Sequence, residues 1–166
     1  MKFILSFVVC SVLFFGSTTY AQNRASAKNQ VISADFVGLF LDGSEFHLQY
    51  EWKSTPVNSW FIRALFGSVG NFTGLGVGGG YRFFLADSRA LTGLALAPVA
   101  HMYFWKSEFQ GSELFFSIGG EVSYKWIFDD FSVEPLLGAG LAFGGDQLAY
   151  LTKVRPYLGI YLGYAW

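Results

Sequence analysis

The chain has 166 residues, with 11 Lys and Arg against 12 Asp and Glu, and its aromatic content of 20% exceeds its charged content of 14%. This balance argues against nucleic acid as a partner, because phosphate binding requires a concentrated positive surface. Few soluble domains of this size bury so many aromatic rings, so the composition predicts that much apolar surface faces something other than water.

The chain opens in the order of a secretory signal peptide, with Lys2, an apolar run from Phe3 to Phe15, and small residues ending at Ala21. We expect cleavage after Ala21, which leaves about 145 residues for one domain. The single cysteine, Cys10, lies in the apolar run, so the exported protein would have neither a disulfide nor a thiolate metal site.

The mature chain is predicted to be a series of β-strands. Residues 22–30 are polar and aperiodic and predict a flexible leader. Beyond them, apolar residues recur at the period of a β-strand, and segments such as Asp42-Gly43-Ser44 are typical of hairpin turns. The eight predicted strands span residues 31–41, 45–53, 59–66, 75–85, 90–105, 113–128, 131–143 and 155–166.

Each predicted strand has one apolar face, and an even number of strands can close on itself. The runs also bracket the roughly 9–11 residues that cross a bilayer at a tilt. A helical membrane protein is disfavoured because the uncharged run 91–105 has only fifteen residues and the run 131–143 is broken by Glu134 and Pro135, so neither reaches the ~20 apolar residues of a spanning helix. A soluble lipocalin-like or avidin-like barrel would have a polar outer face. We therefore predict an all-β fold, an eight-stranded antiparallel up-and-down transmembrane β-barrel over residues 31–166.

Aromatic residues gather at both ends of the predicted strands, which is typical of girdles at the two membrane interfaces. If the N-terminus is periplasmic, the periplasmic girdle would contain Trp52, Trp60, Phe83, Trp126, Phe128, Phe131 and Trp166, and the outer girdle Phe40, Phe46, Phe66, Phe104 and Phe143.

Two prolines, Pro98 and Pro135, lie within predicted strands. A closed barrel has no free edge that tolerates a missing N–H group, so we expect a β-bulge at one or both positions. Such a bulge would reverse the facing of the residues beyond it, and the predicted facing of His101 and Glu134 depends most on this point.

Polar residues on the second face are predicted to fill the barrel lumen as a paired network, because buried charges are costly unless paired. An eight-stranded interior is just wide enough for side chains to fill. A narrow pore, in which the network rearranges, is the alternative. The predicted lumen residues are Asp35, His47, Gln49, Glu51, Arg63, Arg82, His101, Glu121, Lys125, Glu134 and Arg155.

No motif predicts a cofactor, a metal site or catalysis. The glycines from Gly74 to Gly79 match a nucleotide-binding pattern, but no helix follows them, and we expect glycines on the lumen face to give room to Arg82 and its neighbours or to help the strand bend. The chain has two histidines, and neither joins a serine and a carboxylate at the lipid-facing wall, as a lipid A deacylase-like enzyme would require. A lipid-modifying enzyme or acyltransferase, and ligand or partner binding by an aromatic rim around Phe109, Phe115 and Tyr150, remain alternatives.

The last predicted strand carries an apolar face that ends on an aromatic residue, formed by Leu158, Ile160, Leu162, Tyr164 and Trp166. This alternation resembles the signal that the outer-membrane barrel-assembly machinery reads, and residues 31–166 resemble the small OmpA-type and OmpX-type barrels. The resemblance implies a monomer without a cofactor in the outer membrane of a Gram-negative-type bacterium, with membrane lipid and the assembly machinery as partners.

Members of such families are envelope-stabilising proteins, adhesins, narrow pores or lipid-modifying enzymes, so the fold does not choose among them. The predicted outer loops, at residues 42–44, 67–74, 106–112 and 144–154, are shorter than those of the adhesive members. We therefore expect a non-catalytic barrel with a structural or interaction role in the envelope.

Overall fold

The structure is a computed structural model that describes residues 28–35, 37, 44–69, 72–85, 91–107, 111–144 and 154–166. The predicted signal peptide, Phe40, Phe109 and Tyr150 lie outside these ranges. Gln30, the last residue of the predicted leader, begins the first strand. The strands are β1 (Gln30–Asp35), β2 (Ser44–Thr55), β3 (Asn58–Val69), β4 (Phe72–Phe84), β5 (Gly93–Ser107), β6 (Gly111–Phe128), β7 (Phe131–Phe143) and β8 (Val154–Ala165).

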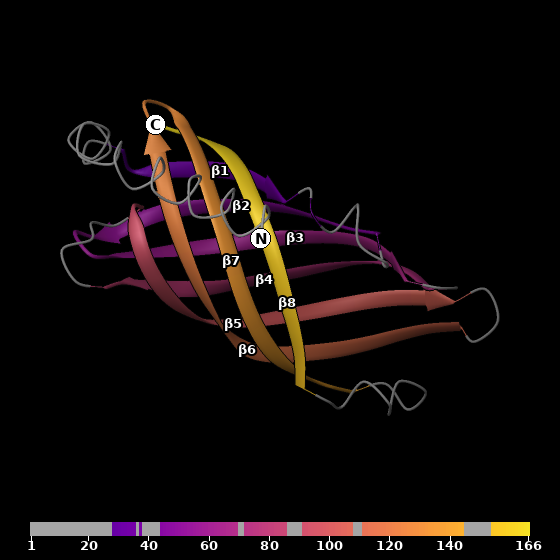
Figure 1. Cartoon of the computed structure of the whole chain (residues 1–166). Coiled ribbons are helices and arrows are strands. Elements are labelled where there is room, and N and C mark those ends of the chain that lie inside the picture. The colour runs from indigo at the N-terminus through magenta and orange to yellow at the C-terminus, as the bar shows by residue number, and fades with distance from the viewer. Residues whose placement is uncertain are drawn as a thin grey trace, which may run out of the picture.

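The strands form one closed barrel in chain order, as Figure 1 shows. Each pairs antiparallel with the next, and β1 closes the barrel by pairing with β8. Asp35, for example, lies opposite His47 of β2 and Tyr161 of β8. The predicted all-β, eight-stranded, antiparallel up-and-down fold is thus confirmed.

Alternation within each strand separates an apolar outer face from a polar or small-residue inner face. In β6, the inner residues Glu121 and Lys125 are buried, whereas Ile118 on the outer face is 53% exposed. All eight strands place exposed large hydrophobic side chains on the outside. The sheet therefore has the opposite polarity to a soluble barrel, since its charges lie inside.

The bulges expected at Pro98 and Pro135 are wrong. Pro98 stays paired with Gly120 of β6. Toward β4, the ladder is interrupted only between Gly80 and Phe83, and the register of β4 against β5 is the same on both sides of this interruption. Pro135 shows the same pattern, with continuous pairing to β8 and a two-residue lapse toward β6. A missing N–H removes ladder bonds toward one neighbouring strand, and no extra residue is inserted.

The two ends of the barrel differ, and we name them by their connections. The turn end carries the β2–β3, β4–β5 and β6–β7 connections, and the loop end carries the other four. At the turn end, an apolar cluster of Val31, Leu91, Ile127 and Ala165 fills the interior. Leu91 was predicted as strand, but it precedes β5 with φ of 77° and is fully buried.

Among the described residues, no helix is long and apolar enough to span a membrane.

Candidate functional site: the charged interior

Four charged residues from four different strands form a closed ring of alternating ion pairs near the turn end. Arg82 Nη2 lies 2.8 Å from Glu134 Oε1, and Lys125 Nζ lies 3.0 Å from Glu134 Oε2. Arg82 and Lys125 both also pair with Glu51, whose other carboxylate oxygen accepts a hydrogen bond from Ser59 Oγ at 2.5 Å. All four charged side chains are essentially excluded from solvent, and the two cations balance the two carboxylates.

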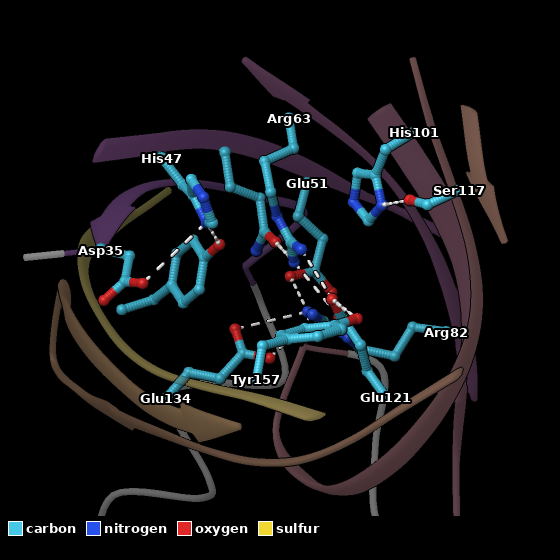
Figure 2. A network of polar contacts seen from close by, with 12 residues as sticks. Asp35, His47, Glu51, Arg63, Arg82, His101, Ser117, Glu121, Glu134 and Tyr157 are labelled. Carbon is cyan, nitrogen blue, oxygen red and sulfur yellow. Dashed lines mark hydrogen bonds and ion pairs between the residues drawn. The ribbon is translucent and has the colours of Figure 1, made fainter. Parts of the chain in front are cut away.

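A second cluster lies on the loop-end side of this ring and centres on a bidentate pair. Arg63 Nη1 donates to Glu121 Oε1 at 2.6 Å, and Arg63 Nη2 donates to Glu121 Oε2 at 3.2 Å. Gln49 Oε1 accepts a further hydrogen bond from Arg63 at 2.7 Å, and the Tyr157 hydroxyl donates to Glu121 at 2.8 Å. Figure 2 shows Arg63, Glu121 and Tyr157 pointing from the surrounding wall toward the centre of the barrel.

Phe61 of β3 connects the two clusters through its ring. The guanidinium carbon of Arg63 lies 5.0 Å from the Phe61 centroid, and that of Arg82 lies 4.7 Å from the same centroid. Tyr161 contacts Arg63 in the same way, at 5.0 Å. Rings stacked on guanidinium groups hold these cations by cation–π attraction while they exclude water from the ion pairs.

His47 and Asp35 extend the network along the wall formed by β1, β2 and β8. His47 Nδ1 lies 3.0 Å from the Tyr161 hydroxyl and 3.9 Å from Asp35 Oδ2. Asp35 also accepts hydrogen bonds from the backbone N–H groups of Val37 at 3.0 Å and Ile160 at 3.1 Å. A carboxylate that accepts two backbone N–H groups helps to fix the β1–β8 closure.

The structure places ten of the eleven predicted lumen residues inside the barrel. His101 and Glu134 keep their predicted inward facing, because neither proline shifts the register. The Arg155 side chain is outside the part of the chain that the structure describes. The buried residues are Asp35, Gln49, Glu51, Arg63, Arg82, His101, Glu121, Lys125 and Glu134, and His47 is partly buried.

Sequence reasoning missed the aromatic part of the site. Tyr157, Tyr161 and Phe61 contact the buried charges directly. A signal for the two tyrosines was present, since both share the face of the last strand that carries Arg155. They were not selected because a tyrosine on a barrel strand suits the membrane interface as well as the interior.

The glycines of β4 were expected to give room to Arg82 and its neighbours, and Gly80 does so for Phe61, the ring that contacts Arg82. The other inward glycines make room for side chains of β5. A Cβ at Gly76 would lie 3.0 Å from Tyr103 Cδ1, and one at Gly74 would lie 3.0 Å from Trp105 Cδ2. A Cβ at Gly78 would overlap the imidazole of His101. The β5 side chains therefore lie flat against a wall that has no side chains of its own.

The predicted aromatic residues of the turn end are joined on the outer face by tyrosines that the prediction omitted. Tyr81 lies 4.5 Å from Trp60 and 4.8 Å from Phe83 between ring centroids, and Tyr50 lies 5.7 Å from Trp52 and 6.3 Å from Trp166. At the loop end, Phe46 pairs with Phe66, and Phe143 stacks on Phe116. The remaining predicted members on described strands are Trp126, Phe128, Phe131 and Phe104.

Within the described ranges, no group of three or more His, Cys, Asp or Glu side chains is placed to hold a metal ion. His101 Nδ1 lies 3.3 Å from Ser117 Oγ, but His101 Nε2 has no hydrogen-bond partner among the described residues. A serine–histidine pair needs a third group to orient the imidazole for catalysis. The described residues therefore lack the arrangement of a hydrolytic triad.

The fold and its interior define a class of protein: closed eight-stranded up-and-down β-barrels with paired charges inside and an apolar outer face. Comparison of the chain with family models, curated proteins and solved structures found no match.

Proposed function

We propose that this protein is an integral outer-membrane β-barrel with a packed polar lumen and a non-catalytic, structural or interaction role in the envelope. One observation carries the proposal, namely the reversed polarity of the barrel wall. Leu48, Ile62, Val77, Leu96 and Ile118 expose their apolar side chains near the middle of their strands, whereas the charged side chains of the ring and of the Arg63–Glu121 pair are buried inside. In water such a surface would drive association, and in a bilayer it is solvated by acyl chains.

Two further features support a membrane location. Trp60, Tyr81 and Phe83 form part of an aromatic band at the turn end, where amphipathic rings suit a lipid headgroup region. The resemblance to OmpA-type and OmpX-type barrels, with the final strand as an assembly signal, adds insertion by the barrel-assembly machinery as a monomer.

The packed interior favours a structural barrel over a pore. The ring of Arg82, Glu51, Lys125 and Glu134 crosses the lumen, and the apolar cluster around Leu91 closes the turn end below it. A narrow pore is the second candidate, because ion pairs can exchange partners. We predict that the pure protein in planar bilayers gives no stable conductance steps, and such steps would favour the pore.

Membrane fractionation combined with heat-modifiable gel migration tests the proposal. We expect the mature chain in the outer-membrane fraction, and we expect the unheated sample to migrate differently from the boiled sample because the barrel stays folded in detergent. Recovery in the soluble fraction with no change in migration on boiling would contradict the proposal.

The non-catalytic role makes a separate prediction. Deletion of the gene should leave the acylation of lipid A and of phospholipids unchanged, because the described interior has no oriented triad. Mass spectra of lipids from the two strains measure this, and a lost or gained acyl chain would favour a lipid-modifying enzyme.

A further inference from the structure

The lumen is sealed toward the turn end and accessible to solvent toward the loop end. In β6, the inward residues from Glu113 to Gly119 are partly exposed, and those from Glu121 to Ile127 are buried. In β7, the inward residues from Ser132 to Gly138 are buried, and the following inward residues are partly exposed. We call the loop-end half of the lumen, on the loop-end side of the Arg63–Glu121 pair, the vestibule; its inward side chains include Glu45, His47, His101, Tyr103, Glu113 and Phe115.

One wall of this vestibule is an aromatic stack across β5 and β6. Tyr103 and Phe115 lie opposite each other in the register, with ring centroids 4.7 Å apart and planes 13° apart. Trp105 continues the stack on Phe115 at 6.3 Å and 18°. Because Gly74 and Gly76 stand beside this stack, no side chain of β4 covers it. Tyr103 and Phe115 are therefore partly exposed on the inner side of the barrel wall.

Three polar atoms of this wall are buried and have no hydrogen-bond partner among the described residues: His101 Nε2, Trp105 Nε1 and Glu113 Oε2. His101 and Trp105 are each only 7% exposed, and Trp105 lies directly opposite Glu113 in the register. A buried polar atom without a partner is unfavourable, so the site is complementary to a ligand that supplies the partners. Trp105 requires an acceptor, and Glu113 requires a donor.

The charge of the vestibule selects the kind of donor. Arg63, Arg82 and Lys125 are already paired with carboxylates deeper in the lumen. Among the described side chains, Glu45 has an ion contact only with His47, at 3.3 Å, and Glu113 has no Lys or Arg partner. Among the described side chains, the Glu113 carboxylate thus lies beside aromatic rings without a cationic partner, which is the combination that attracts an organic cation.

We propose that the loop-end vestibule binds one small organic cation, with its ammonium group at Glu113, its planar body on the Tyr103–Phe115 stack and a hydrogen-bond acceptor at Trp105. An eight-stranded barrel has room for one small ligand where side chains leave it unfilled. This inference goes beyond a structural role and does not depend on whether the turn end conducts.

Tyramine, tyrosol and 4-hydroxyphenylacetate form a matched set of probes, because they share a hydroxyphenyl ring and differ in carrying a cation, a neutral hydroxyl or an anion. Each would be titrated into the folded protein in detergent micelles by calorimetry and by the ¹⁵N–H signal of the Trp105 indole, assigned with Trp105→Phe. We expect saturable single-site binding of tyramine that shifts this signal. Tyrosol should bind at least about tenfold more weakly, because a hydrogen bond to a charged group contributes more than a neutral one.

Two variants and one control locate the site, and heat-modifiable migration confirms that each folds. Glu113→Gln should weaken tyramine binding about tenfold and tyrosol binding less, because tyramine loses an ion pair and tyrosol only the charge of its acceptor. Phe115→Leu should weaken both, because the stack is lost. Asp130→Asn, the same kind of change at the opposite end of the barrel, should change neither. Equal binding of the three probes, an unshifted Trp105 signal, or Glu113→Gln binding tyramine like the unmodified protein would overturn the proposal.

Discussion

At the scale of single residues, the interior is organised by mutual neutralisation. Glu51 is completely buried and contacts two cations and one hydroxyl, so its charge is matched on more than one side. Removing both members of a buried pair is often tolerated, but removing one member leaves an uncompensated charge. The ring of four charges is therefore sensitive to single substitutions at any of its members.

Arg82→Met tests this sensitivity. The substitution leaves Glu51 and Glu134 with Lys125 as their shared cation, and we expect the free energy of unfolding to fall by about 3–5 kcal/mol. Urea titration of the protein in detergent micelles measures the change. Lys106→Met is the control, because Lys106 is exposed at the loop end, and a comparable loss there would show that the buried ring is not responsible.

Glycine positions provide a second test with a matched pair. A Cβ at Gly78 would overlap His101 and lie 2.9 Å from the backbone oxygen of Ala100, so Gly78→Ala should cost about 1–3 kcal/mol of stability. Gly120 lies on the outer face, where the nearest atom to a new Cβ is Ala97 O at 3.8 Å. Gly120→Ala should therefore be nearly neutral, and equal effects of the two substitutions in the same titration would count against the packing described.

The facing of the charged residues was predictable from the sequence, whereas their partners were not. Alternation along one strand assigns Arg63 and Glu121 to the same compartment. It contains no information on which carboxylate Arg63 meets, because the two residues lie on strands that are not adjacent. The sequence predicted the aromatic wall of the vestibule even less well, because a glycine-rich strand is compatible with bending as well as with large side chains on the neighbouring strand.

At the scale of the elements, an aromatic band surrounds the outer face near the turn end. Each strand either has an outer aromatic residue there or lies next to a strand that has one. Sequence reasoning found the tryptophans because they stand at predicted strand ends. It omitted Tyr50, Tyr81 and Tyr164, which lie on the same outer face and contact those tryptophans. The band is therefore more continuous than single-strand patterns indicate.

The Trp60–Tyr81 contact allows the band to be tested as a unit. A double-mutant cycle with Trp60→Ala and Tyr81→Ala should give a coupling energy of about 0.5–1.5 kcal/mol, because the two rings lie 4.5 Å apart on adjacent strands. The free energy of unfolding in lipid vesicles is the quantity to measure. Additive effects of the two substitutions would mean that the rings act independently.

The prolines show where element-level reasoning failed. Pro98 was expected to add a residue to its strand, and the structure instead drops two ladder pairs on one side and keeps the register. In a barrel both neighbours of a strand are present, so the intact ladder on the other side holds the alignment. A prediction made from one strand at a time does not take the second neighbouring strand into account, and it therefore overestimates the effect of a proline on the register.

At the scale of the whole molecule, closure explains how the outer surface can be largely apolar. Since β1 pairs with β8, no strand has a free edge that needs water, and the charged faces enclose one another. The number of strands, their order and their approximate limits followed from sequence periodicity. The apolar cluster at the turn end did not, because it depends on Leu91 folding back from a connection.

The position of tryptophan residues relative to lipid tests the central claim most directly. Variants that retain only Trp60, on the outer face, or only Trp105, on the inner face, would be reconstituted in vesicles whose acyl chains carry bromine near the headgroup or near the chain end. We predict that bromine near the headgroup quenches Trp60 most strongly and that neither lipid quenches Trp105. Trp60 emission that is insensitive to both lipids, or equal quenching of the two tryptophans, would contradict an apolar face solvated by lipid around an enclosed polar interior.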